Sequence, residues 1–195
     1  LSAAVLLTAG ALNAQILSAN DLSGFSTLSV LSLDADTLNW SVVDLTGAGT
    51  ALDAAGECML SNSWTGANGA LSPDNLFISP AMDCSTETSV TASGSAGSNE
   101  STVSTYYEEN YAVYVVTDLV ALAAGTFPAA VFETILVGGE ELFNENVDIS
   151  SIAAGQAAVY IVFRHYNCTD MNYMILDDIM VSGGTFTGVA ESSIE

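Results

Sequence analysis

Apolar and polar side chains alternate along several stretches of this sequence, and this alternation constrains the fold more than any other feature. In AVYIVFRHY (158–166), the residues Val159 to His165 at odd positions would lie on one face, and Tyr160 to Tyr166 at even positions on the other. YAVYVVT (111–117) shows the same period of two and is rich in β-branched and aromatic residues. Both features are typical of β-strands.

Further strands are expected in NYMILDDIMV (172–181), with Tyr173, Ile175, Ile179 and Val181 on one face. Turn-rich breaks separate the candidates, and we expect the Ser/Gly-rich stretch 93–102 to be an exposed loop. About ten short strands without a convincing helical period predict an all-β fold, an antiparallel jelly-roll β-sandwich. Weaker strand candidates are 27–33, 38–45, 57–64, 75–79, 87–93, 130–137 and 143–149.

Both ends of the chain differ in character from the region between them. Residues 1–15 contain a short apolar run that is too brief to span a bilayer, followed by Ala14 before Gln15 as a cleavage point. This pattern predicts a signal-peptide-like segment, although a buried strand or short helix would share it. We therefore expect the folded domain at 16–186 and a polar linker at 187–195.

The charge balance limits the partners. The chain holds 23 Asp and Glu residues but only one Lys or Arg, which gives a formal net charge of −22. Contact with nucleic acid needs clustered basic residues, and an anionic membrane would repel this surface, so neither nucleic-acid binding nor direct membrane insertion is expected. Multivalent cations would be attracted, and Ca²⁺ is the natural ion for a site of carboxylate oxygens.

The three cysteines, Cys58, Cys84 and Cys168, allow one disulfide bond and one remaining thiol in an exported chain. The sequence does not choose the pair. Closely spaced ligands such as C-x-x-C are absent, so a cysteine metal site is not predicted.

Four longer segments together resemble one known family. They are LDADTLNWSVVD (33–44), SNSW (61–64), SPDNLFISPAMD (72–83) and DISSIAAGQAAVYIVFRHYNCTDMNYMILDDIMV (148–181). The combination is similar to the cleaved-adhesin, or choice-of-anchor J, domains of Bacteroidetes surface proteins, which accompany secreted proteases and hemagglutinins such as the gingipains. The resemblance covers roughly residues 16–186.

This resemblance implies a non-catalytic jelly-roll module that is secreted or displayed on the outer-membrane surface and stabilised by calcium. It also implies that the tail resembles a linker toward a C-terminal sorting domain of the type IX secretion system. Two stretches depart from the family pattern, namely SANDLSGF (18–25) and DADTLNW (34–40), where the first calcium-binding loop is shortened and lacks its glycines.

Acidic residues near both ends of the domain are the expected calcium ligands. Asp177 and Asp178 follow one another on a predicted strand and would point to opposite faces, so one would be buried and would need a partner. By analogy with jelly-roll modules, Asp21, Asp34 and Asp36, with Asn20 as a neutral oxygen donor, would join them around Ca²⁺. The alternative is that these acids are solvated or pair with Arg164.

The basic residues of 158–166 have structural interpretations. Arg164 is expected to be an internal brace that holds a carboxylate across adjacent strands, with ligand contact as the alternative. His165 is expected to be packed and hydrogen-bonded. No nucleophile, base and orienting group stand at a recognisable spacing, so an enzyme is not predicted.

Five aromatic residues could stack on sugars, although such residues more often belong to a core or a sheet face. They are Trp40, Trp64, Tyr106, Tyr107 and Tyr173. Tyr106 and Tyr107 are the best candidates for ligand contact because polar residues flank them in STYYEEN (104–110). Separately, DTL (36–38) resembles a short O-glycosylation signal of Bacteroidetes, which marks Thr37.

Three functions fit these observations. The first is a surface adhesin that recognises an extracellular protein or glycan. The second is a structural subunit or cargo held in a surface assembly or in the type IX secretion machinery. The third is an ancillary domain of a secreted protease or other hydrolase.

Overall fold

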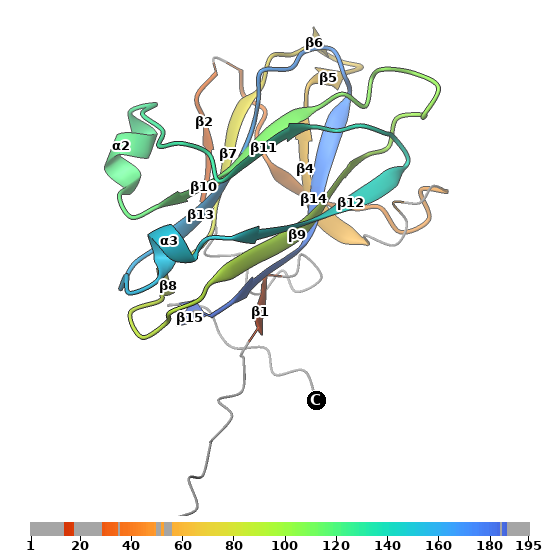
Figure 1. The fold of residues 1–195 in the computed structure, drawn as a ribbon. Coiled ribbons are helices and arrows are strands. Elements are labelled where there is room, and N and C mark those ends of the chain that lie inside the picture. The colour runs from red at the N-terminus through yellow and green to blue at the C-terminus, as the bar shows by residue number, and fades with distance from the viewer. Residues whose placement is uncertain are drawn as a thin grey trace, which may run out of the picture.

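Two antiparallel β-sheets face one another in the computed structural model, which describes residues 14–17, 29–34, 36–49, 52, 56–183 and 185–186. Figure 1 shows the sheets as two layers, each built from strands that are distant from one another in the sequence. The predicted all-β antiparallel sandwich is confirmed. Of the predicted end segments, only Ala14 and Gln15 are described, and residues 187–195 lie outside the described part.

The larger sheet has six strands in the order β12-β9-β14-β4-β3, with β1 paired to the far end of β14. Its members are β1 (Ala14–Leu17), β3 (Ser41–Asp44), β4 (Glu57–Asn62), β9 (Thr91–Ser98), β12 (Glu141–Asp148) and β14 (Tyr173–Ser182). We call it the six-stranded sheet.

The second sheet has five strands in the order β11-β10-β13-β7-β2. Its members are β2 (Ser29–Ser32), β7 (Asp74–Ile78), β10 (Asn110–Val116), β11 (Phe132–Ile135) and β13 (Tyr160–Tyr166). Two small ribbons pair the remaining strands, which are β5 (Trp64–Thr65) with β6 (Gly69–Ala70), and β8 (Met82–Asp83) with β15 (Thr185–Phe186).

The alternation predicted for 158–166 is observed on strand β13. On β13, Ile161 and Phe163 face the core between the sheets, and His165, on the same face, is fully buried. Val162 belongs to a separate apolar cluster on the outer face of the five-stranded sheet, where Leu122 of α2 (Leu119–Ala123) packs against it. Because both faces of the sheet are covered, β10 and β13 are apolar on both sides.

Strand β14 departs from the predicted alternation at its centre. Ile175 belongs to the outer apolar cluster of the six-stranded sheet, whereas Ile179 and Val181 lie in the core between the sheets. The prediction that these residues share one face was therefore wrong. The register against β9 shifts between Asp177 and Met180, and Asp178 has a positive φ of 49°. A β-bulge adds one residue and exchanges the faces of everything beyond it.

The Ser/Gly-rich stretch predicted to be a loop is largely strand β9, which lies inside the six-stranded sheet between β12 and β14. Its small side chains allow close approach. A Cβ on Gly97 would lie 2.4 Å from the carbonyl oxygen of Glu141 on β12. Low β-propensity hid this strand from sequence reasoning, because the contacts that stabilise it come from its neighbours.

The helices of the described chain are short, and α2 lies on the outer face of the five-stranded sheet. The Asp118 side chain accepts the backbone N–H of Val120 and so caps α2, while α3 (Ser150–Ala153) is a single turn. No helix among the described residues is long and apolar enough to cross a membrane. Cys58, Cys84 and Cys168, all of which are described, are free thiols, so the disulfide allowed by their number does not form.

Candidate functional site

Asp34 and Asp36, the first group of predicted calcium ligands, lie in a turn that their side chains stabilise by hydrogen bonds. Asp34 follows β2 and accepts hydrogen bonds from the Ser32 hydroxyl at 2.9 Å, the Asp36 N–H at 2.9 Å and the Asp74 N–H at 2.7 Å. Burial opposes ionisation of Asp34, but these hydrogen bonds lower its pKa below the usual value. Thr37, the predicted glycosylation residue, is exposed in the same turn, and its modification stays a prediction.

The second group lies at the bulge of β14. The Asp177 side chain is 3% exposed, and its Oδ1 atom is buried without a hydrogen-bond partner among the described groups. Burial, together with the negative charge of exposed Asp178, raises the pKa of Asp177 to about 6. A buried carboxylate oxygen without a donor is costly, and a cation bound here would lower that cost.

The structure does not bring the predicted ligands into one group. Asp34 and Asp36 follow a strand of the five-stranded sheet, whereas Asp177 and Asp178 belong to the six-stranded sheet. No three of these four carboxylates gather within 4.8 Å of one another in the described part of the chain. Asp21 and Asn20 lie outside the described residues. Calcium binding itself stays a prediction.

Arg164 lies on β13 and holds Asp74 on the adjacent strand β7. Its Nε donates to Asp74 Oδ1 at 2.6 Å and its Nη2 to Asp74 Oδ2 at 2.8 Å. The guanidinium also stacks on Phe127 and Tyr166, at 3.9 and 4.2 Å from the ring centroids. The carboxylate held by Arg164 is thus Asp74, and neither Asp177 nor Asp178 is its partner.

This burial of the only arginine in a chain without lysine predicts resistance to trypsin. The Arg164–His165 bond lies on β13, which is hydrogen-bonded to strands on both sides, and the Arg164 side chain is 16% exposed. Incubation of the folded protein with trypsin should leave it intact on an SDS gel. After unfolding in urea, a single cut should give fragments 1–164 and 165–195 of this chain. Rapid cleavage of the folded form would contradict the buried position of Arg164.

The aromatic candidates divide into core and surface residues. Trp40 is 4% exposed, and its indole N–H donates to the Asn75 carbonyl at 3.0 Å, so this residue is part of the core. Tyr173 packs against the outer apolar cluster of the six-stranded sheet. Trp64 and Tyr106 remain 41% and 52% exposed, and these two can contact a partner.

Three segments meet at the end of the sandwich that carries β5, seen at the top of Figure 1. The Trp64 N–H donates to the Asn172 carbonyl at 2.9 Å, and the Asn172 side chain donates to Glu100 at 2.6 Å. The Glu100 carbonyl lies against Gly139. We call these segments, 64–70, 99–109 and 137–140, the loop surface. Its exposed apolar residues are Trp64, Val103, Tyr106 and Val137.

A buried polar network lies below the loop surface, and the sequence analysis predicted only one of its members. His165 is packed and hydrogen-bonded as expected. Its Nδ1 lies 2.8 Å from the Ser61 Oγ, and its Nε2 lies 2.9 Å from Glu109 Oε2 and 3.1 Å from the Cys168 Sγ. Ser63 donates to the second oxygen of Glu109 at 2.7 Å. The network therefore joins β4, the end of the 99–109 segment just before β10, β13 and the 167–172 loop.

The order Ser61, His165, Glu109 resembles the hydrogen-bonding order of a hydrolase triad. All three side chains are 0% exposed, so a substrate carbonyl could not reach the Ser61 hydroxyl in this arrangement. Ser63 also accepts the N–H groups of Met171 and Asn172 at 3.0 and 3.1 Å. The network thus holds the β13–β14 loop against the core.

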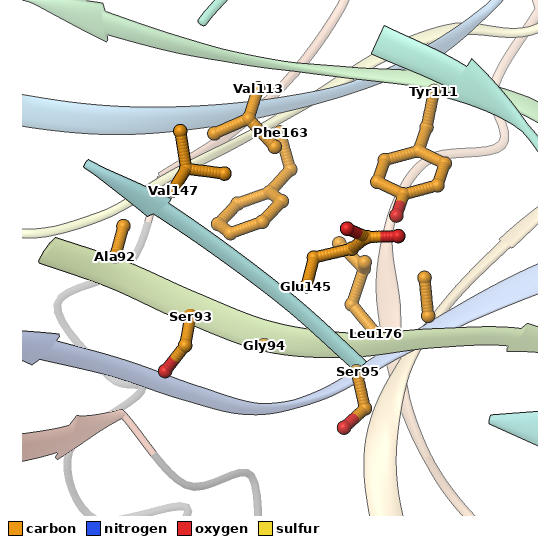
Figure 2. Close-up of a pocket in the computed structure, with 11 residues that line it drawn as sticks. Ala92, Ser93, Gly94, Ser95, Tyr111, Val113, Glu145, Val147, Phe163 and Leu176 are labelled. Carbon is orange, nitrogen blue, oxygen red and sulfur yellow. The ribbon is translucent and has the colours of Figure 1, made fainter. Parts of the chain in front are cut away.

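The cavity between the sheets is too small to hold a sugar. Figure 2 shows it lined by Ala92 and Gly94 of β9, Tyr111, Phe163 and the Glu145 carboxylate, which lies beside the tyrosine ring. Its volume is about 20 Å³, which is room for roughly one water molecule. A ligand would therefore bind on the outside of the sandwich.

Two antiparallel sheets with exposed aromatic residues at one end define a β-sandwich of the type found in binding modules. TmCBM61, solved in complex with beta-1,4-galactotriose, superposes with a TM-score of 0.52 and 11% identity, over 84% of this chain and 97% of that one. At this identity the likeness shows the shared fold alone.

The sequence profile of the Cleaved Adhesin Domain matches residues 26–181, and the chain belongs to this family. The K1 cleaved adhesin domain of Lys-gingipain from Porphyromonas gingivalis W83 superposes with a TM-score of 0.66 and 25% identity, over 86% of this chain and 96% of that one. Hemagglutinin A of the same organism is 29% identical over 184 residues, which is 78% of this chain but 8% of that protein's length. The resemblance inferred from the sequence is confirmed.

Proposed function

We propose that this chain is a non-catalytic adhesin module, secreted or displayed on the cell surface, that binds an extracellular protein or glycan through its loop surface. Membership of the Cleaved Adhesin Domain family carries this proposal. The likeness to a hemagglutinin and to the fold of a galactotriose-binding module supports it. Secretion through the type IX system stays a prediction.

The loop surface has the chemistry of a recognition site. Tyr106 and Trp64 present large rings to solvent, and such residues dominate the binding energy of many interfaces. Trp64 and Glu100 both hydrogen-bond to Asn172, which ties two of the three segments to the 167–172 loop and lowers the entropy lost on binding. Tyr107, the other predicted contact residue, is half-buried and lies next to Gly139.

Binding to arrays of glycans and extracellular proteins tests this proposal. Tyr106→Ala should weaken saturable binding by at least about tenfold, because a stacked ring at the centre of an interface contributes more than about 1.4 kcal/mol. Val120→Ala is the matched control, since Val120 is 79% exposed on α2, outside the loop surface. Equal binding by the two variants would show that the loop surface is not the recognition site.

We also propose that Ca²⁺ stabilises the module at the β14 bulge. The buried Asp177 Oδ1 without a partner supports this site, and a Ca²⁺ ion there would take Asp177 and Asp178 as carboxylate ligands. Strand β1 ends at Leu17, opposite Ile179, and so lies next to the bulge. Asp34 and Asp36 are not part of this proposed site.

The second candidate function is an ancillary domain of a larger secreted protease. A stretch of 25 residues is 60% identical to Gingipain R1 of Porphyromonas gingivalis, and it covers 2% of that protein. A catalytic domain encoded in the same precursor would favour this role. Purification of a stable assembly with other surface proteins would instead favour the structural-subunit alternative.

A further inference from the structure

We propose that Glu109, His165 and Cys168 bind a divalent transition-metal ion of the zinc type. A carboxylate oxygen, an imidazole nitrogen and a thiol sulfur from these residues lie within 4.8 Å of one another. They are the one group of three such ligands in the described part of the chain. Sulfur and nitrogen donors select zinc and related ions and exclude calcium, so this site is independent of the proposed calcium site.

The ligand atoms are arranged for a shared ion. His165 Nε2 faces both Glu109 Oε2, at 2.9 Å, and Cys168 Sγ, at 3.1 Å. Zinc bonds of about 2.0–2.3 Å in tetrahedral geometry place ligand atoms about 3.3–3.6 Å apart, so each pair would separate by a few tenths of an ångström. The loop that carries Cys168 can supply this movement, since it is half-exposed while the other two ligands are fully buried.

Neighbouring groups would orient the ligands as second-sphere partners commonly do. The Nδ1 of His165 lies 2.8 Å from the Ser61 Oγ, so an N–H there can donate to the hydroxyl and leave Nε2 free to bind metal. The Ser63 hydroxyl donates to the remaining oxygen of Glu109. Both ligating side chains are thus fixed before an ion arrives.

Charge balance favours an ion at this position. Glu109 is fully buried, and the only arginine or lysine of the chain is Arg164, which is paired with Asp74. Arg164 is therefore not available to neutralise Glu109, whereas a bound cation at this position would do so. A divalent ion would neutralise Glu109 together with a Cys168 thiolate.

An entry route and a fourth coordination position lie on the Cys168 side. A surface depression of about 310 Å³ is lined by Ser72, Pro73, Asn167, Cys168 and Thr169. An ion could reach the sulfur from this depression, and a water molecule there could complete a tetrahedral shell. The site would then hold the β13–β14 loop to the core of the sandwich.

Cobalt titration tests the proposal, because Co²⁺ reports its ligands spectroscopically. The chelator-treated protein is titrated with Co²⁺ in excess Ca²⁺, which saturates sites made only of oxygens. We expect one equivalent to give visible d–d bands and a near-ultraviolet thiolate-to-cobalt band, both displaced by Zn²⁺. Cys168→Ser should abolish the thiolate band, whereas Cys84→Ser, which changes a buried cysteine outside the group, should retain it.

Several outcomes would overturn the proposal. These are a wild-type titration without a thiolate band, an equal band in Cys168→Ser, or Co²⁺ bound through oxygen alone. If Cys168→Ser does not fold, X-ray absorption of the Zn²⁺-loaded wild-type protein decides the question. One sulfur in the first coordination shell supports the site, and a shell without sulfur contradicts it.

Discussion

Replacing Glu109 with alanine is expected to lower the free energy of unfolding by about 3–5 kcal/mol, the largest effect we predict for a single substitution. The carboxylate is fully buried, and its loss would leave the Ser63 hydroxyl and His165 without their acceptor. Urea unfolding followed by circular dichroism, with chelator present throughout, measures the change without a metal contribution.

The neighbouring residue provides the control for this experiment. Glu108 is exposed, so Glu108→Ala should change the free energy of unfolding by less than about 0.5 kcal/mol. A double-mutant cycle between Glu109→Ala and Ser63→Ala should give a coupling energy of about 0.5–3 kcal/mol, because the two side chains are hydrogen-bonded. A loss below about 1 kcal/mol in Glu109→Ala would mean that the network does not stabilise the fold.

Only one residue of the buried network, His165, could be predicted from the sequence. Period-two patterning predicted β10 and β13 and placed His165 on the same face as Ile161 and Phe163, which is correct and is the inward face. A polar residue at an inward position needs buried hydrogen-bond partners, so the position of His165 alone indicated that a buried polar network exists. The partners could not be identified, because Ser61 is 104 residues and Glu109 is 56 residues away along the chain. The packing of the two sheets brings Ser61 to His165, and the pairing of β10 with β13 brings Glu109 there.

The two errors in the strand assignment have a common physical origin. Strand β9 contains only Thr, Ala, Ser and Gly, and it is a strand because β12 and β14 pair with it on both sides. The bulge of β14 is set by the shifted register against β9, which reversed the faces predicted beyond Asp177. In both cases tertiary pairing overrode the local pattern. The resemblance to a known family was more robust, since it depended on motifs spread over the whole domain.

The bulge leads to the second large effect, which is expected for Asp177→Asn. The pKa of Asp177 lies at about 6, against an ordinary value of 3.8, because of burial and the nearby charge of Asp178. Between these two values the folded state binds a proton that the unfolded state has lost. The contribution of Asp177 to stability is therefore highest below pH 4, falls as the pH rises, and is lower by about 3 kcal/mol well above pH 6 when no cation is present.

Asp177→Asn removes this penalty, so without calcium the variant should be about 2–3 kcal/mol more stable than the wild type above pH 6.5 and similar to it near pH 4. Other carboxyl groups, such as Asp34, have a lowered pKa and stabilise the fold as the pH rises. Their contribution is the same in both proteins, so it disappears when one stability curve is subtracted from the other. Asp178→Asn, which keeps the buried carboxylate, should show a smaller gain. Melting curves with Ca²⁺ or with EGTA complete the test. Calcium should stabilise the wild type at pH 7 far more than Asp177→Asn, and an equal response of the two proteins would refute a calcium site at the bulge.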